Sequence, residues 1–253
     1  MTFLVAGTTT FLFTTLLTIA GVGAAFILIP VFLALGIGVH TAMATALLLN
    51  AVAMSVASIN FIRQKLIIWR IAVPILLVAS ALSPLGARIS QGLDKTILLW
   101  LFIGFLMFAA LMMLFYTPRA RKTISGTGTL LGVGLGVGGF GGFVGGLLGV
   151  GGGNIIVPAL VALGIDPKKA AATTSFVVIF ASLAGFLGHV SMAGMNSALL
   201  IWTVVGSALG AVLGSWLMTD KLKGRQVKLI IGLVLIGIAV NMAWKQIHLS
   251  NNG

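Results

Sequence analysis

The residues best placed to do chemistry in this 253-residue sequence form a glycine-rich run, Gly149 to Asn154. The run lies inside an apolar stretch, and Pro158 follows it. Glycine and proline weaken a helix by roughly 1 and 3 kcal/mol relative to alanine, so we expect a helix to break here. Glycine leaves main-chain N–H groups uncovered, and a helix that starts beyond the break directs the positive end of its dipole at the gap. This pattern predicts a binding site for a small anion.

The same pattern occurs near the start of the chain, in Gly21, Gly23 and Pro30. When the sequence is shifted by 128 residues, 12 of the 25 positions from 21 to 45 are identical to their counterparts in the second half. A Gly-x-Gly and a proline that coincide in one register indicate an internal duplication. We therefore divide the chain into a first repeat at residues 1–118, a basic linker at 119–126 and a second repeat at 127–253.

The composition indicates a membrane protein. Hydrophobic residues make up 59% of the chain and charged residues 7%, a balance typical of transmembrane helices and not of soluble domains. The net charge of +12 could suggest a nucleic-acid partner, but the Lys and Arg residues lie in short stretches between apolar segments, which favours a role in membrane orientation. Cysteine is absent, which excludes disulfides and thiolate metal sites. We expect no metal and no cofactor.

Each repeat opens with a long apolar run, at residues 3–35 and 130–165. The first run has 33 residues; a single helix of that length would be about 50 Å long, too long for a hydrocarbon core of about 30 Å, and two full crossings need about 40 residues. Two half-helices that meet at the glycine break fit better, as a hairpin that enters and returns on one side. Further apolar segments follow at residues 41–62, 71–87 and 96–116 in the first repeat and at 170–188, 198–219 and 227–244 in the second.

The basic residues favour three full crossings per repeat over four. With four crossings the two sides of the membrane would carry eight and seven Lys and Arg residues, whereas with a hairpin and three crossings they carry twelve and three. The positive-inside rule prefers the second arrangement, and an odd number of crossings makes the repeats antiparallel. We predict an all-α membrane protein of two inverted repeats, each a broken (re-entrant) helical hairpin plus three transmembrane helices, with both termini outside the cytoplasm.

Small residues mark one face of the first limb of each hairpin. Gly138, Gly142 and Gly146 recur every four residues, and the repeat places three threonines at the corresponding positions of the first half, Thr10, Thr14 and Thr18. This spacing suits close packing of membrane helices. Direct contact of the threonines with a substrate is the alternative.

The predicted hairpins contain no ionisable residue, and the three aspartates fall at segment ends. A transported cation usually needs a buried carboxylate, whereas backbone N–H groups and helix N-termini can hold an anion without a fixed charge. An anionic substrate is therefore favoured, and neutral solutes stay open. The candidate substrate contacts are Gly21, Gly23, Ala24, Ala25, Thr45 and Asn50 in the first repeat and Gly149, Gly151, Gly152, Gly153, Asn154, Thr173, Thr174, Ser175 and His189 in the second.

Each candidate also has a structural explanation. The glycines can serve helix packing alone, and the Thr and Ser hydroxyls can bond to the helix backbone. Asn50, like Asn60, needs a polar partner in apolar surroundings, and a neighbouring helix can supply one. His189 can be a packing residue as well as an anion or proton contact. Ser191 follows it by two residues, but such residues do not face each other on a helix and no acid is placed to orient the histidine, so we do not expect an enzyme.

Two glycine-rich segments, each with a proline and then an Ala-Thr-rich helix start, resemble the TauE/SafE family of bacterial membrane transporters. The residues that carry this resemblance, which covers nearly the whole chain, are Gly21 to Pro30 with Ala44-Thr45, Gly149 to Pro158 with residues 172–175, and His189 with Gly194. The resemblance implies a multi-pass protein of the bacterial plasma (inner) membrane that exports sulfite, sulfonates such as sulfoacetate, or related sulfur-containing anions.

The first copy of the motif departs from the family pattern. It has Ala24, Ala25 and Phe26 where the second copy has two glycines and an asparagine. We therefore expect the second repeat to make more of the ligand contacts.

The expected mechanism is alternating access, in which an anion binds between the hairpin tips and one repeat rocks against the other. A passive anion channel of the same fold, or an importer of a related anion such as thiosulfate or sulfate, is the alternative. Coupling could use His189, the substrate's own protonation, or the electrochemical gradient alone. The expected partners are a small anionic substrate and the lipid bilayer, without nucleic acid, and the sequence allows a homo-oligomer.

Overall fold

The computed structural model describes residues 2–25, 28–29, 32, 37–115, 127–189 and 197–251. Within these ranges every regular element is a helix, as predicted, and two of them are π-helical segments, η1 and η2. In chain order the elements are α1 (Thr2–Ala20), α3 (Val39–Arg63), α4 (Trp69–Ser90), α5 (Lys95–Phe115), α6 (Thr127–Val133), η1 (Gly134–Gly138), α7 (Gly139–Leu147), α8 (Gly153–Ala162), α9 (Pro167–Gly188), α10 (Ser197–Trp216), η2 (Leu217–Lys221) and α11 (Gly224–Asn251). Pro30, Ser191, Gly194 and the predicted linker at residues 119–126 lie outside the described ranges.

Four helical stretches of the described chain are long and apolar enough to cross a membrane: Thr41–Arg63, Trp69–Ser90, Pro167–Gly188 and Leu200–Lys221. The outer surface is also apolar, since Leu77, Phe108, Leu209 and Leu233 are each more than half exposed. Water-soluble proteins rarely expose apolar side chains over such a large area. The structure is that of a multi-pass membrane protein.

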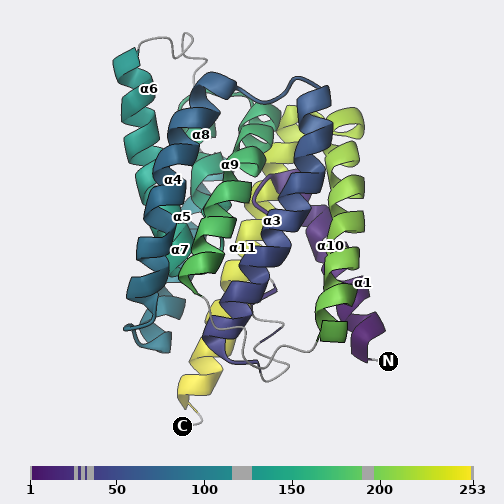
Figure 1. The fold of residues 1–253 in the computed structure, drawn as a ribbon, viewed down its shortest axis with the longest axis vertical. Helices are drawn as coiled ribbons and strands as arrows, with labels where there is room; N and C mark the ends of the chain where they lie inside the picture. Colours follow the sequence, from purple (N-terminus) through teal and green to yellow (C-terminus); the bar gives the residue numbers. More distant parts are fainter. Residues whose placement is uncertain are drawn as a thin grey trace.

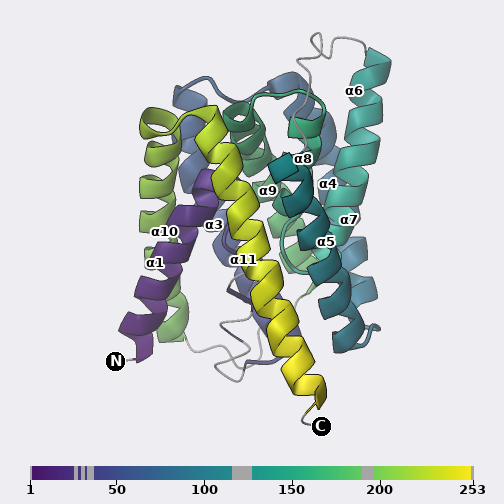
Figure 2. The same cartoon turned by 180° about the vertical axis from the view of Figure 1, so that it is seen from behind.

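Helix packing follows the sequence repeat. The shift of 128 residues relates α1 to the α6–η1–α7 limb, α3 to α9, α4 to α10 and α5 to α11. The first limb of each half packs on the other half, because α1 lies along α10 while η1 and α7 lie along α4 (Figures 1 and 2). The related helices α3 and α9 contact each other, as do α5 and α11. Each half is thus built around elements of the other.

The two opening limbs start at opposite ends of the molecule. In Figure 1 the N-terminus lies at the lower end and α1 rises from it, whereas α6 begins at the upper end. From α6 the chain descends through η1 and α7 and then turns back upward in α8. The C-terminus lies at the lower end, like the N-terminus.

Glycines let α7 approach α4 closely, as the spacing of Gly138, Gly142 and Gly146 predicts. A Cβ added at Gly142 would overlap the backbone of Ala79, and one added at Gly146 would overlap the backbone of Ser83. The prediction of a packing face is confirmed for these glycines. Membrane helices gain van der Waals contact when small residues allow their backbones to approach in this way.

In the related seam between α1 and α10 the glycines lie on the other helix. A Cβ at Gly210 would lie 3.0 Å from the Cβ of Thr14, and one at Gly214 would lie 2.9 Å from the Cβ of Thr18. The buried threonines of α1 therefore fill the space that the glycines of α10 leave. The same close approach is reached with the small residues exchanged between the partners.

The end of α3, the start of α9 and η2 meet at one end of the molecule. The Nδ2 of Asn60 donates to the Oγ1 of Thr219 (3.3 Å), and the Nζ of Lys168 donates to the carbonyl of Thr219 (2.8 Å). Asn60 thus has the interhelical partner that its place in an apolar helix requires. Nine Lys and Arg residues lie in or beside the helix ends at this end (Figure 1): Arg63, Lys65, Arg70, Lys168, Lys169, Lys221, Lys223, Arg225 and Lys228.

Candidate anion site at the helix breaks

Both glycine breaks are present, and their backbones are alike. Gly21 and Gly23 have φ of +71° and +75°, and their repeat partners Gly149 and Gly151 have +69° and +74°. A left-handed conformation costs a residue with a side chain roughly 1–2 kcal/mol, and glycine avoids that cost. The Gly-x-Gly spacing therefore encodes two left-handed residues in each half.

The first glycine of each break ends a helix in a Schellman motif. In the first half the N–H of Gly21 donates to the carbonyl of Thr18 (3.0 Å), and the N–H of Val22 donates to the carbonyl of Leu17 (3.2 Å). In the second half Gly149 and Val150 make the same two bonds, to Gly146 (3.2 Å) and Gly145 (2.8 Å). This pattern satisfies the last carbonyls of a helix that has no following turn. The chain therefore leaves the helix at both positions with two of the last carbonyls bonded.

Helix α8 starts directly after the second break, inside the protein. Its N-cap is Gly152, with φ of +78° and no side chain to cap the first turn. The first N–H groups of a helix have no partner within the helix, so those of Gly152, Gly153 and Asn154 lack an intrahelical acceptor at the break. All three residues are buried. This gives a helix N-terminus, with its partial positive charge, at a site from which charged side chains are absent in the described chain.

Asn154 adds a polar side chain at this N-terminus. Its side chain is fully buried, and neither its Nδ2 nor its Oδ1 has a hydrogen-bond partner among the described residues. A buried amide without partners costs about 1–3 kcal/mol, so such groups are rare in folded proteins. An acceptor oxygen of a ligand at the site would satisfy its Nδ2.

The two breaks meet. A Cβ added at Gly153 would lie 2.8 Å from the Cα of Val22, so the start of α8 touches the middle of the first break. Ala24 and Ala25, which complete the first break, are fully buried, and the N–H of Leu28 donates to the carbonyl of Ala24 (3.1 Å). The same bond joins Ile156 to Gly152 (3.1 Å). Two segments 128 residues apart in sequence therefore form one centre.

Asn50 lies against both breaks from α3. A Cβ at Gly23 would overlap its Oδ1, and a Cβ at Gly151 would lie 2.8 Å from its Nδ2. The Nδ2 donates to the Oγ of Ser182 on α9 (3.0 Å), while the Oδ1 has no partner among the described residues. Asn50 thus has the interhelical bond that its burial demands and an oxygen left at the centre. Sequence reasoning missed Ser182, whose one signal was a hydroxyl in an apolar helix.

The hydroxyls at the starts of α3 and α9 are mostly engaged by backbone. Thr45 donates to the carbonyl of Thr41 (2.7 Å), and Ser175 donates to that of Ala171 (2.9 Å). Thr173 accepts from the N–H of Ile68 (3.1 Å), the residue that precedes α4. Thr174 is the exception, since its buried Oγ1 has no partner among the described residues. Backbone bonding thus accounts for three of these four hydroxyls.

His189 connects the end of α9 to the second break. It is the C-cap of α9, is 1% exposed, and its Nε2 donates to the carbonyl of Gly146 (3.0 Å). That carbonyl also accepts from the N–H of Gly149, the first left-handed glycine. His189 therefore supports the backbone of the break from outside.

The core holds no carboxylate. All three aspartates of the chain, Asp94, Asp166 and Asp220, are exposed, and the sequence has no glutamate. Among the described residues no group of His, Asp or Glu side chains is placed to hold a metal ion. The polar groups at the centre are N–H groups, amides and hydroxyls, which can bind an anion but offer a metal cation no negative charge.

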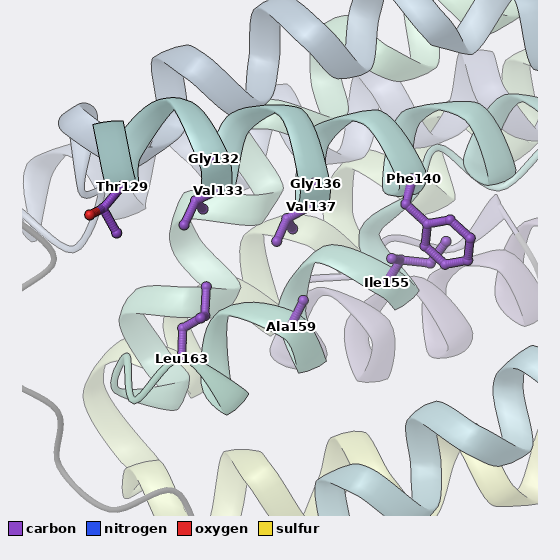
Figure 3. A pocket seen from close by; sticks show the side chains of 9 residues that line it. All are labelled: Thr129, Gly132, Val133, Gly136, Val137, Phe140, Ile155, Ala159 and Leu163. Atoms are coloured by element: carbon purple, nitrogen blue, oxygen red, sulfur yellow. The ribbon is translucent and has the colours of Figure 1, made fainter. Parts of the chain in front are cut away.

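A cavity beside this centre is apolar. A groove of about 580 Å³ lies between the α6–η1–α7 limb and α8, and Figure 3 shows side chains of both limbs projecting toward it. Ile155 and Phe140 border it at one end and Leu163 at the other, and Thr129 supplies a hydroxyl. Such a surface suits acyl chains and not an anion, so we place the candidate site at the breaks.

Comparison with known proteins bears on what this architecture does. Residues 6–242 match the protein family described as "Sulfite exporter TauE/SafE". A stretch of 107 residues, 42% of the chain, is 29% identical to the "Probable membrane transporter protein YunE" of Bacillus subtilis (strain 168) and covers 39% of that protein. The matched stretch thus spans about two fifths of the curated relative. No solved structure matches the chain.

Proposed function

Because this chain belongs to the sulfite exporter TauE/SafE family of membrane transporters, whose members are not enzymes, we propose that it is a secondary transporter that exports small sulfur-containing anions such as sulfite or sulfonates. The observation that carries the proposal is the contact of two glycine-built helix breaks, at Gly153 and Val22, in a core without carboxylates. An oxyanion presents several acceptor oxygens and a negative charge, which uncovered N–H groups and a helix N-terminus complement.

The substrate contacts that we propose follow from the geometry of the centre. The N–H groups of Gly152, Gly153 and Asn154 and the side chain of Asn154 face the break from α8, and Asn50 faces it from α3. The left-handed glycines Gly21, Gly23, Gly149 and Gly151 shape the backbone around them. Ala24, Ala25, Thr45, Thr173, Thr174, Ser175 and His189 are the remaining members of the proposed site.

We also propose that the halves are inverted repeats that alternate access to this centre. The packing of each opening limb on the other half, together with limbs that start at opposite ends of the molecule, supports a two-fold axis in the membrane plane. In the described structure the breaks are in contact, so opening on either side requires one half to move against the other. Rocking of packed halves supplies such a movement.

The basic end of the molecule faces the cytoplasm in this proposal, and the protein lies in the bacterial inner membrane. The nine basic residues at the ends of α3 and η2 and at the starts of α4, α9 and α11 support that orientation through the positive-inside rule. Both chain termini then lie outside the cytoplasm (Figure 1). The positive charge would also raise the concentration of anions at the inner mouth.

A proteoliposome flux assay tests the proposal. The panel comprises sulfite, sulfoacetate, thiosulfate, sulfate and a neutral solute of similar size. We expect saturable flux of a sulfur anion with counterflow, and loss of that flux in Gly152→Val, because the added side chain would overlap the carbonyl of Gly141 at a left-handed position. Gly136→Val is the matched control, since a Cβ at Gly136 meets nothing within 4 Å.

The outcomes separate the proposed function from its alternatives. Ohmic current at channel rates would replace the carrier by a passive anion channel, and flux that accumulates thiosulfate or sulfate inward would make the protein an importer. Equal flux of the neutral solute, or full activity of Gly152→Val, would remove the anion site from the breaks.

A further inference from the structure

A second cavity, of about 360 Å³, lies between α3 and α10 and has no part in the proposed transport site. Its walls change in character along the two helices. Val56 and Ile59 of α3 and Val212 of α10 line the part nearer the middle of the molecule, and Asn60, Arg63 and Ser215 line the part nearer the basic end. The cavity is therefore amphiphilic, with its charged group at the helix end.

The cavity opens on the outer, lipid-facing surface. Ile59 and Val212 are each 55% exposed, and Trp216, which also lines the cavity, is 44% exposed. A ligand that reaches it from the bilayer carries its apolar part with it. Tryptophan is typical of the membrane interface, where its ring lies at the level of the lipid headgroups.

Arg63, and Lys221 beside the lining residue Trp216, place positive charge at the polar part of the cavity. The Arg63 side chain lines it, and the Nζ of Lys221 lies 5.3 Å from the ring centroid of Trp216, over the ring. A guanidinium binds phosphate oxygens in a bidentate manner, and basic cavities between transmembrane helices are suited to anionic headgroups. Asp220 is the nearest acidic residue along η2, and it is exposed. The charge of the cavity complements an anionic lipid.

The repeat-related seam in the other half is closed at the position that corresponds to the cavity between α3 and α10. The related seam between α9 and α4 has Gly188 in place of Asn60 and Ala87 in place of Ser215. There a Cβ added to Gly188 would lie 2.8 Å from the Cβ of Ala87, so the two helices are in close contact. Between α3 and α10 the larger Asn60 instead bonds to Thr219, in the π-helical turn η2. π-Helical turns are frequent at functional sites.

We propose that the cavity between α3 and α10 binds one anionic phospholipid from the basic-end leaflet. Its phosphodiester contacts Arg63, with the Nδ2 of Asn60 as a further donor, and an acyl chain lies along Val56, Ile59 and Val212. This lipid is bound independently of the transported anion.

Lipid retention by the purified full-length protein tests this site. Wild-type protein, Arg63→Gln and the control Arg88→Gln are incubated with phosphatidylglycerol or phosphatidylcholine of identical acyl chains, and bound lipid is counted by native mass spectrometry. Arg88 lies in the last turn of α4, at the repeat position of Trp216 and beside the closed seam. We expect wild type and Arg88→Gln to retain more phosphatidylglycerol than phosphatidylcholine. In Arg63→Gln the ratio of retained phosphatidylglycerol to phosphatidylcholine should fall about fivefold, the factor for one basic group near an anionic surface.

Two further arms identify the ligand. Val212→Trp should lower retention of phosphatidylglycerol, because the larger side chain fills the space for the acyl chain. Glycerol phosphate, which has the headgroup chemistry without the tails, should not displace bound lipid. Equal retention of the two lipids by wild type, unchanged preference in Arg63→Gln, or displacement by glycerol phosphate would each overturn the proposal.

Discussion

Gly21 to Ala25 in the first half and Gly149 to Gly153 in the second are related by the repeat, and their backbones differ far less than their side chains. Both begin with a left-handed glycine that closes a Schellman motif, and both place a second left-handed glycine two residues later. The second break adds a third left-handed residue, Gly152, where the first has Ala24. The two Gly-x-Gly turns thus share their backbone geometry, whereas the residues that follow them differ in both backbone and side chain.

The polar groups around the two breaks are also distributed unequally. Asn50 faces both breaks, and the repeat places Val178 at its counterpart on α9. Its hydrogen-bond partner Ser182 has Met54 as a counterpart on α3. The centre therefore has one polar pair, Asn50 and Ser182, whereas exact symmetry between the halves would give two. The glycines thus set the shape of the centre, while the asymmetric side chains Asn50, Ser182 and Asn154 give it polarity.

The largest expected effect compares the first glycines of the two breaks. Gly21→Ala should lower the free energy of unfolding by about 2–5 kcal/mol, from a left-handed alanine and an overlap with the backbone of Ala171. Gly149→Ala should cost less, because the nearest atoms to the added Cβ would be the Cβ and Cγ of Met43 (2.6 Å), and a side chain shifts more easily than the backbone. Thermal unfolding in detergent measures both. A larger loss in Gly149→Ala than in Gly21→Ala would contradict this account.

Asn154→Leu should separate stability from transport. Removing a buried amide without partners should raise the free energy of unfolding by about 1–3 kcal/mol, whereas anion flux should fall at least about tenfold if the amide contacts the substrate. Asn60→Leu is the control, since it removes a hydrogen bond to Thr219 and should destabilise by about 1 kcal/mol. A stabilised Asn154→Leu that transports normally would take Asn154 out of the site.

The starts of α9 and α3 give a smaller contrast. Asp166 caps α9 by accepting from the N–H groups of Lys168 and Lys169, whereas its repeat partner Gly38 precedes α3 without a side-chain cap. We expect Asp166→Ala to destabilise by about 1 kcal/mol and Gly38→Asp to stabilise by a few tenths of a kcal/mol. Chemical denaturation of the two variants measures this. No gain in Gly38→Asp would show that a side-chain cap does not act at α3.

The smallest effect concerns pH at the starts of α5 and α11. The N–H of Thr96 donates to the Oδ1 of Asp94 (2.7 Å), and this bond lowers the pKa of Asp94 below its ordinary value. The stabilisation is therefore present above the ordinary aspartate pKa and is lost as the pH falls through the lowered value. At α11 the neutral Gln226 accepts from the N–H of Lys223 instead (2.7 Å).

Thermal unfolding of wild type and Asp94→Asn between pH 7 and about pH 3 measures this difference. Wild type should lose stability relative to Asp94→Asn as the solution is acidified. A parallel pH dependence of the two proteins would mean that the carboxylate contributes nothing in the folded state. Gln226→Ala should change stability equally at both pH values, since its amide does not titrate.

The sequence by itself determined the features that depend on local chemistry. The helix breaks follow from Gly-x-Gly, because few other residues adopt two left-handed conformations so close together. The close packing of α7 on α4 follows from glycines spaced by four, and the long helices follow from apolar runs of membrane length. The matching φ values in the two halves reflect the same local rule applied twice.

Only the tertiary structure decided which distant residues meet at the centre. Asn50 and Ser182 are 132 residues apart, Ile68 and Thr173 are 105 apart, and Gly146 and His189 are 43 apart. A polar residue in an apolar helix predicts that a hydrogen-bond partner exists but not which residue it is, because the partner depends on how the helices cross. The sequence therefore determines where the helices break. The packing of α3 and α9 determines which amide and hydroxyl groups contact those breaks.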